Sequence, residues 1–258
     1  MPTTQLSAAI ITLNEEANIE RCLRSLQGWV DDIVVVDSNS VDRTREIAAA
    51  HGARVVVHDW EGFVGQKNFA LAQCRHDWVF SIDADEEVSA ELRRELAELI
   101  PLLEENARQP MAYMVPRRVW YGGRWILHGD WYPDYVTRLF YRPTAHFAGA
   151  AVHERLVHEG KSQKLRSPLN HYSFRDEADH RERMEKYSTL WARSKFESGA
   201  RAGAATPYAR AIFRFFRGAF IKQGLLDGPI GLRVALLCSR EVFMKYHKLR
   251  QLSAAGRP

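Results

Sequence analysis

Two aspartates separated by one residue lie at the end of an apolar run, a spacing that suits a divalent cation. Residues 78–83, WVFSID, have the pattern of a buried β-strand, and Asp85, Glu86 and Glu87 follow. Carboxylates this close repel one another unless solvent, a cation or a ligand offsets the charge. Ala84 is small, so Asp83 and Asp85 can both approach one Mg²⁺ or Mn²⁺ ion, which also takes oxygen ligands from substrate phosphates. The run predicts either a metal site for a nucleotide diphosphate or an exposed acidic turn.

Polar residues also follow two other predicted strands. Thr12, Asn14 and Glu15 come after the first strand, and Asp37 ends the second. In an open parallel sheet, ligands bind at the carboxyl ends of the strands. We therefore expect the Asp37 carboxylate to point into the crevice, where it can accept from a base N–H or a ribose hydroxyl. The chain contains neither G-x-G-x-x-G nor G-x-x-x-x-G-K-[ST], so the dinucleotide-binding and P-loop classes lack their phosphate loops.

Strands and helices alternate in the first half of the chain, which predicts βαβ units and an α/β fold with a mostly parallel sheet. Asn14 is available as a cap for the first helix, and Ser89 for the fourth. The predicted strands cover residues 6–12, 32–38, 54–58 and 78–83, and the predicted helices cover 17–26, 42–52, 65–74 and 89–103. Residues 111–180 suggest antiparallel strands, and the chain beyond 181 is helical.

Charge is distributed unevenly among these three parts. Residues 1–110 carry 10 Lys and Arg against 20 Asp and Glu, whereas residues 181–258 carry 16 against 5. The middle part, 111–180, carries 10 against 7. An acidic front and a basic tail predict different partners for the two ends.

The remaining composition favours a globular protein of the cytoplasm. The chain has 258 residues, of which 46% are hydrophobic, enough for a substantial core. Its three cysteines, Cys22, Cys74 and Cys238, fit no metal spacing and are expected to be reduced core residues. We find no signal peptide and no apolar window of about 18 residues that would span a membrane.

Several motifs in combination resemble a known family. "AAIITLNEEANIERCLRSL", "VDSNSVDRT", "GQKNFAL" and "FSIDADE" look like the inverting glycosyltransferases of family 2. The continuation "WYPDYVTRLFYR", "FAGAAVHERL" and "LNHYSF", with "GLLDGPIGLRVALL" near the end, is similar to lipopolysaccharide core β-glucosyltransferases that act on inner-core heptose. The resemblance implies a GT-A (Rossmann-like) fold, with a nucleotide-sugar-binding half at 1–110, an acceptor-binding and catalytic half at 111–180, and a basic helical extension at 181–258.

The resemblance also implies roles for the strand-end residues. Thr12, Asn14 and Glu15 would line the nucleotide pocket, Asp37 would bind the base, and Asp83 would bind the ribose.

A metal ion and the diphosphate would lie beside them. Asp85 would hold a Mg²⁺ or Mn²⁺ ion that bridges the diphosphate, and His171 matches a histidine that returns to this ion. Lys67 lies near the nucleotide in similar enzymes, where its ammonium would meet the diphosphate; the alternative is a solvated helix lysine. Glu86 and Glu87 are expected to face solvent ahead of the next helix.

The motif "VHERL" supplies the expected catalytic base. An inverting transferase deprotonates the acceptor hydroxyl as that hydroxyl attacks the anomeric carbon, so it needs one base facing the sugar. Glu154 has the right type, and His153 is the alternative because its unperturbed pKa also suits a base. Arg138 is expected either to pair with acidic groups of the acceptor or to brace the fold.

Four aromatic residues between the metal motif and this base either stack on sugar rings or fill a core. They are Trp125, Trp131, Tyr132 and Tyr135.

A basic amphipathic helix is predicted in residues 208–224. Arg210, Arg214 and Arg217 share one helical face, and an apolar face that includes Phe216 lies opposite. Such a helix lies in the plane of a membrane surface or packs on the catalytic domain. Nucleic acid is not an expected partner, because no nucleic-acid motif accompanies the basic residues.

Taken together, these features predict an inverting, metal-dependent sugar transferase at the cytoplasmic face of the inner membrane. The expected donor is UDP-glucose or another UDP-sugar, and the expected acceptor is a lipid-linked glycan. The alternatives are a nucleotidyltransferase, which would use the same nucleotide, metal and carboxylates, and a non-catalytic membrane adaptor that keeps the fold.

Overall fold

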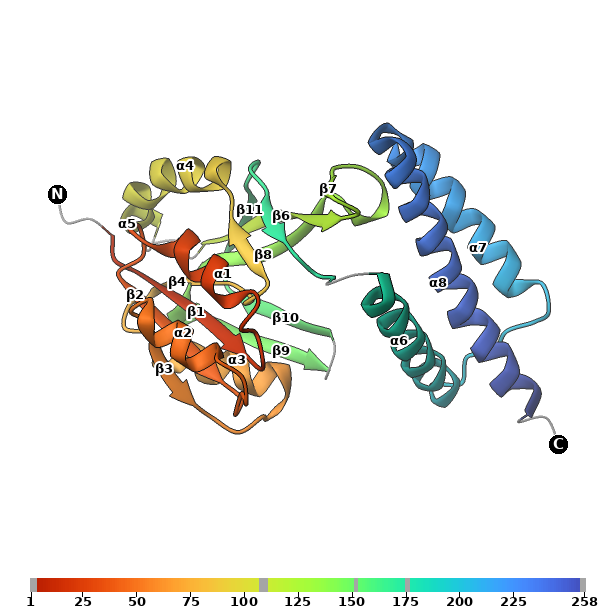
Figure 1. The fold of residues 1–258 in the computed structure, drawn as a ribbon, viewed down its shortest axis with the longest axis horizontal. Coiled ribbons are helices and arrows are strands. Elements are labelled where there is room, and N and C mark those ends of the chain that lie inside the picture. Colours follow the sequence, from red (N-terminus) through yellow and green to blue (C-terminus); the bar gives the residue numbers. More distant parts are fainter. Residues whose placement is uncertain (1–3, 107–110, 151–152, 175–176, 256–258) are drawn as a thin grey trace. The chain divides into compact units, whose positions relative to one another are not determined.

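The computed structural model describes residues 4–106, 111–150, 153–174 and 177–255, without the side chains at 105, 106, 150, 153, 177 and 255. The chain forms two compact units (Figure 1). The N-terminal unit comprises residues 1–117 and 134–171, and the C-terminal unit comprises 118–133 and 172–258. The functional division at residues 110 and 180 stays a prediction.

A mostly parallel sheet forms the centre of the N-terminal unit. Strands β1 (Leu6–Thr12), β2 (Asp32–Asp37), β3 (Arg54–Val57) and β4 (Trp78–Ser81) are parallel, in the order β3-β2-β1-β4. The β-branched and apolar runs of β1, β2 and β4 are buried on both faces, as parallel strands inside a sheet require, whereas the edge strand β3 is only partly buried. This confirms the predicted α/β fold.

Antiparallel strands extend this sheet. Strand β8 (Asp134–Tyr141) pairs with β4, and β6 (Met111–Tyr121) pairs with β8. Strands β12 (Leu169–His171) and β5 (Glu86–Val88) follow and are antiparallel to each other, whereas β11 (Lys161–Lys164) pairs with β6 in parallel. Strands β9 (Ala145–Ala150) and β10 (His153–His158) form a separate antiparallel pair, joined to β8 through the short η3 (Arg142–Thr144). The smaller antiparallel portion is thus also confirmed.

Two apolar layers cover the two faces of the parallel strands. Leu6, Ala8 and Ile10 of β1 point to one face, and Ala9 points to the other, because side chains alternate along a strand. The first face packs under α1 (Ile19–Leu26), α2 (Thr44–Ala50) and α4 (Ala90–Leu99), which continues into η1 (Ile100–Leu102) and α5 (Leu103–Asn106). The second face packs against α3 (Gly62–Gln73) and β9.

Of the two helix caps expected from the sequence, the cap of α4 is confirmed and the cap of α1 is wrong. Ser89 caps α4 as expected, since its Oγ accepts a hydrogen bond from the Leu92 N–H at 3.0 Å. The expected cap of α1 is wrong: the helix begins at Ile19 after Asn18, and Asn14 lies four residues further upstream in a loop.

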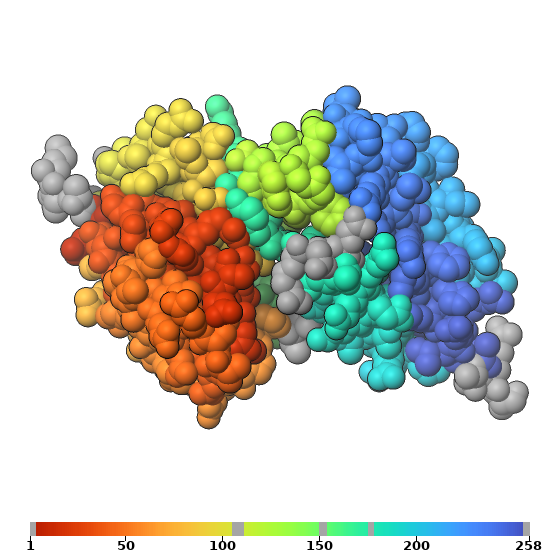
Figure 2. Space-filling model, viewed as in Figure 1, coloured from red at the N-terminus to blue at the C-terminus, as the bar shows by residue number. Residues whose placement is uncertain are grey.

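Helices make up most of the C-terminal unit; they are the teal to blue ribbons of Figure 1, and the same colours mark their atoms in Figure 2. Helices α6 (Glu177–Glu197) and α7 (Thr206–Phe216) both pack against α8 (Gly228–Ala255). The π-helix η4 (Arg217–Ile221) and the 3₁₀ turn η5 (Gly224–Asp227) connect α7 to α8. At this connection a Cβ on Gly231 would lie 1.9 Å from the Gly224 carbonyl oxygen, so only glycine fits. None of the described helices is long and apolar enough to cross a membrane.

The segment 118–133 belongs to this unit because Asp227 holds it. Strand β7 (Arg124–Ile126) pairs with the end of β6, and η2 (Gly129–Trp131) follows. The Leu127 and His128 N–H groups both donate to Asp227 Oδ2 at 2.9 Å. Of the predicted aromatic residues in this segment, Trp131 packs against a core cluster, where it contacts Tyr121 and Phe174, and Trp125 lies edge-on to Tyr172.

Two of the three arginines on the basic face of the amphipathic segment pair with a buried carboxylate. Arg214 Nε lies 2.9 Å from Asp130 Oδ2, and Arg217 donates to Asp130 Oδ1. The Asp130 side chain is 1% exposed. Arg210, the third arginine of this face, is exposed. Membrane contact by this segment stays a prediction.

Candidate active site

Thr12 and Asp37 meet where β1 and β2 end. The two residues are register partners, and Thr12 Oγ1 donates to Asp37 Oδ2 at 3.0 Å. The Ser40 N–H donates to Asp37 Oδ1 at 2.8 Å, and the Ser40 hydroxyl donates to Oδ2. Asp37 is 0% exposed, which corrects the expected orientation into an open crevice. The carboxylate organises the turn after β2, and its contact with a nucleotide base stays a prediction.

The loops after β1 and β2 are cross-linked to each other. The Asn14 N–H donates to Ser40 Oγ at 2.8 Å, and Asn14 Oδ1 accepts from the Val41 N–H at 2.9 Å. The Glu15 N–H donates to Thr44 Oγ1 at 2.7 Å. Asn14 has a φ of 56°, in the left-handed region that asparagine tolerates better than most residues. The predicted nucleotide-pocket residues thus form one rigid loop pair at the carboxyl edge of the sheet.

The acidic run after β4 is held by the buried Arg138 and the half-buried Arg117. Arg138 donates to both Asp83 Oδ2 and Glu86 Oε1 at 2.5 Å. Arg117 Nη1 lies 3.3 Å from Glu86 Oε1, and Glu86 is 1% exposed. Glu87 accepts from Asn170 Nδ2 at 2.9 Å and is half-buried. The expected solvent exposure is therefore wrong for Glu86, while Glu87 is half-buried; Arg138 braces the acidic run.

The charges around Asp83 keep it ionised. Burial alone would raise the pKa of this carboxyl, but Arg138 and Lys67 outweigh burial and hold the pKa well below its usual range. Burial likewise acts to lower the pKa of Arg138, and the carboxylates of Asp83 and Glu86 raise it above its ordinary value. The ion pairs offset the cost of removing these charges from water.

Asp85 and His171 lie side by side. His171 Nε2 is 3.3 Å from Asp85 Oδ2, because β12 pairs with β5 and places His171 opposite Glu86. A carboxylate oxygen and an imidazole nitrogen fit Mn²⁺ or Mg²⁺ when a diphosphate and water supply the other ligands. Within the described ranges, no group of three or more His, Cys, Asp or Glu side chains could hold a metal by itself. Metal binding by this pair stays a prediction.

Lys67 connects Asp83 to Glu154. Its Nζ lies 3.2 Å from Asp83 Oδ1 and 3.2 Å from Glu154 Oε1. Helix α3 supplies Lys67 and strand β10 supplies Glu154, so the contact joins residues 87 positions apart. Lys67 is 8% exposed, which excludes the alternative of a solvated helix lysine. The side chain of His153, the alternative base, lies outside the described residues.

A cavity of about 450 Å³ opens beside this contact. Its lining includes Lys67, Asp83 and Glu154 together with Tyr135 and Arg155. Tyr135 is the one of the four predicted aromatic residues that lines this cavity. The cavity therefore has room for a sugar-sized group next to a carboxylate and an ammonium.

Sequence reasoning missed the buried pair of Glu86 and Arg117. A usable signal was present: Glu86 is two residues before Val88, and side chains two apart on a strand share a face. Both Glu86 and Val88 are buried in the structure. Ser40 and Thr44 were also missed as cross-links, because their partners lie 26 and 29 residues away.

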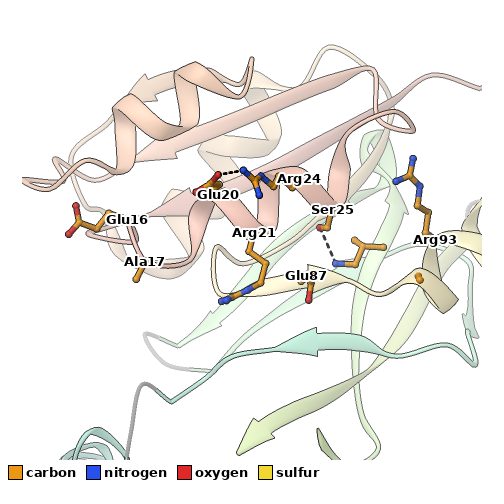
Figure 3. A pocket seen from close by; sticks show the side chains of 10 residues that line it. Glu16, Ala17, Glu20, Arg21, Arg24, Ser25, Glu87 and Arg93 are labelled. Carbon is orange, nitrogen blue, oxygen red and sulfur yellow. Dashed lines mark hydrogen bonds and ion pairs between the residues drawn. The ribbon is translucent and has the colours of Figure 1, made fainter. Parts of the chain in front are cut away.

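A second cavity, of about 560 Å³, lies beside α1 (Figure 3). Glu87 lines this cavity, but none of the predicted site residues does. Its charges have partners of their own: Arg24 pairs with Glu20, and Arg21 donates to Asn18 Oδ1. Figure 3 also shows the Val88 N–H donating to Ser25 Oγ at 3.0 Å. This cavity is a charged surface hollow, separate from the candidate site.

Comparisons with known proteins identify relatives of the chain. A family model described as "Glycosyl transferase family 2" matches residues 7–121, which include the predicted donor residues and Asp85 but not Glu154 or His171. An uncharacterized glycosyltransferase of Rickettsia bellii is 32% identical over 99% of this chain and 90% of its own length. The lipopolysaccharide core biosynthesis glycosyltransferase LpsC of Rhizobium meliloti is 32% identical over 95% of this chain and 94% of its own length.

Part of the chain is also similar to a solved structure. Glucosyl-3-phosphoglycerate synthase of Mycobacterium tuberculosis, in complex with Mn²⁺, UDP and glucosyl-3-phosphoglycerate, is 31% identical with a TM-score of 0.36. The match covers 47% of this chain and 46% of the synthase, so the chain spans less than half of that solved structure.

Proposed function

The chain belongs to glycosyltransferase family 2, and we propose that it moves a sugar from UDP-glucose to a hydroxyl of a lipopolysaccharide core or related cell-envelope glycan. The new linkage would be β, by inversion at the anomeric carbon. Similarity to LpsC over nearly its full length supports this acceptor class. The acceptor would be lipid-linked, so the enzyme would work at the cytoplasmic face of the inner membrane.

The contact of Lys67 with both Asp83 and Glu154 carries this proposal. It joins the carboxylate assigned to the donor ribose with the carboxylate assigned to the acceptor. Glu154 would accept the proton of the acceptor hydroxyl as its oxygen attacks the anomeric carbon, a contribution of about 10²- to 10⁴-fold in rate. Lys67 would orient Glu154 toward the cavity until the acceptor arrives.

The remaining residues would bind the donor. Thr12, Asn14, Glu15 and Asp37 would shape the nucleotide pocket from the cross-linked loops after β1 and β2. Asp85 and His171 would hold Mg²⁺ or Mn²⁺ through the carboxylate and imidazole atoms that lie 3.3 Å apart. When bound, the ion would neutralise charge on the diphosphate leaving group.

Nucleotide binding is the first test of this proposal. Isothermal titration with UDP, GDP and CDP, with and without Mn²⁺, should show UDP binding that depends on the metal. Asp85→Ala should lose that binding. Asp77→Ala is the matched control, because this half-exposed aspartate immediately precedes β4, at the opposite end of the strand from the site. Absence of nucleotide binding under all conditions would contradict the proposal and favour the non-catalytic adaptor.

Sugar transfer is the second test. With UDP-glucose and a heptose-containing core oligosaccharide, Glu154→Gln should reduce transfer by roughly 10²- to 10⁴-fold while UDP still binds, because glutamine keeps the shape but cannot accept the proton. Transfer at the wild-type rate would exclude Glu154 as the base, and His153→Ala would then test the alternative. Release of pyrophosphate from a nucleoside triphosphate would instead indicate a nucleotidyltransferase.

A further inference from the structure

An exposed apolar surface runs along α7 and η4 in the C-terminal unit. Phe216 and Phe220 stack with their ring centroids 5.5 Å apart. Residues three and four apart on a helix are neighbours, so the other members of this surface adjoin them. We call this surface the phenylalanine ridge; its members and their exposed fractions are Ile212 (58%), Phe213 (60%), Phe216 (53%), Phe220 (55%) and Ile221 (71%).

The ridge is exposed because the opposite face of the same segment is occupied. Asp130 binds Arg214 and Arg217, and this fixes the rotation of the segment about its axis. Gly218 lies directly against Asp130, where a Cβ would come within 2.8 Å of Oδ2. Turning the phenylalanines inward would break both ion pairs and leave a buried carboxylate without its cations.

The chain segment that carries the ridge, residues 206–240, has exposed cations and no exposed carboxylate. Lys222 directly follows the ridge residue Ile221, and Arg233 and Arg240 are exposed on α8, which packs against α7. Arg210 is also exposed, but it lies on the face opposite the ridge. The single acidic residue of that described segment is Asp227, which is buried and accepts from the Leu127 N–H. An apolar surface bordered by cations complements a lipid layer with anionic headgroups.

We propose that the phenylalanine ridge inserts into the headgroup and upper acyl region of an anionic lipid monolayer, with Lys222 and Arg240 contacting the headgroups. This deepens the proposed function and rests on it for the purpose of the contact, which is to bring the transferase to a lipid-linked acceptor. The contact differs from an in-plane helix with all three arginines at the headgroups, because Asp130 binds Arg214 and Arg217.

A second copy of the chain is a poorer occupant of this surface. In a two-fold dimer the same patch faces itself, so each exposed cation at its border approaches cations of the partner copy. The described part of residues 206–240 offers no exposed carboxylate to pair with them. Anionic headgroups supply that missing charge.

Vesicle flotation tests the proposal directly. The full chain should bind vesicles of phosphatidylethanolamine and phosphatidylglycerol (3:1), and bind vesicles of phosphatidylcholine at least about fivefold more weakly, roughly the contribution of one basic residue. The double variant Phe216→Ser/Phe220→Ser should bind the anionic vesicles at least about tenfold more weakly, because each phenylalanine loses its burial in lipid. Both side chains are exposed, so the fold should persist, with an unchanged circular dichroism spectrum and melting temperature.

Leu190→Ser provides the matched control, since this α6 leucine is 46% exposed and lies outside the ridge; it should bind vesicles like the wild type. Equal vesicle binding by the double variant and the wild type would overturn the proposal, as would no binding by the wild type. A dimer in light scattering that the double variant abolishes, without vesicle binding, would also overturn it and identify a second copy as the occupant.

UDP titration of the same proteins separates the two proposals. Metal-dependent UDP binding without vesicle binding refutes only the lipid contact. Vesicle binding without UDP binding refutes only the transferase.

Discussion

Replacing Arg138 by methionine should destabilise the N-terminal unit more than any surface charge removal. Arg138 is 4% exposed and pairs with Asp83 and Glu86. Methionine fills a similar volume but has no charge, so Arg117 remains as the arginine that pairs with Glu86, at 3.3 Å between Nη1 and Oε1. Removing one partner of a buried ion pair costs about 3–5 kcal/mol, because the remaining charge stays buried with less compensation.

Urea unfolding measures this loss. With a slope of roughly 2 kcal/mol per M, the expected cost lowers the midpoint of the N-terminal unit by about 1.5–2.5 M. Arg138→Lys keeps the charge but loses the two-pronged geometry, so its midpoint should fall between the methionine variant and the wild type.

Arg142→Met is the matched control. Arg142 pairs with Asp77 at 3.0 Å, but that aspartate side chain is 53% exposed. An exposed pair contributes about 0–1 kcal/mol, so the midpoint should shift by at most about 0.5 M. If Arg138→Met shifts the midpoint no more than Arg142→Met, the argument that Arg138 holds the acidic run together is refuted.

Two further predictions concern other buried carboxylates. Burial acts to raise the pKa of Asp32, but its hydrogen bonds from Arg54 prevail and hold the pKa below its ordinary value. The stability that this pair contributes is therefore present above the ordinary aspartate pKa near 4 and is lost as pH falls below it. Between pH 6 and 3, the urea midpoint should decline less steeply for Asp32→Asn than for the wild type. An identical decline in the two proteins would contradict the assignment. Asp130→Asn should destabilise the C-terminal unit by about 2–3 kcal/mol, since Arg214 and Arg217 lose a charged partner. Thermal unfolding followed by circular dichroism measures this, and an unchanged melting temperature would show that the pairs do not hold the segment in place.

Local patterns in the sequence were enough to predict the four parallel strands of the sheet, but not the short strand β5. The run of residues 32–38 is too continuously apolar for a one-sided strand, and β2 is indeed buried on both faces. The three cysteines are free and buried, as expected of core residues. Burial raises the pKa of Cys74 to about 12 and that of Cys238 to about 11.

Residues that approach each other across the fold were only partly predictable. The sequence placed Asp85 and His171 in one site through resemblance, and the structure brings them to 3.3 Å. It did not place Lys67 against Glu154, because that contact depends on how β9 and β10 pack beside α3.

The sequence by itself determined which elements form and which chemical groups lie at the carboxyl edge of the sheet, because side-chain periodicity and residue type are local properties. Tertiary structure alone decided which charges are neutralised and which faces are turned outward. Glu86 is buried because Arg138, 52 residues away, pairs with it. The phenylalanine ridge is exposed because Asp130, 87 residues from Arg217, binds the opposite face of its segment. An amphipathic pattern defines two faces of a helix, but the partner that packs against it decides which one meets the solvent.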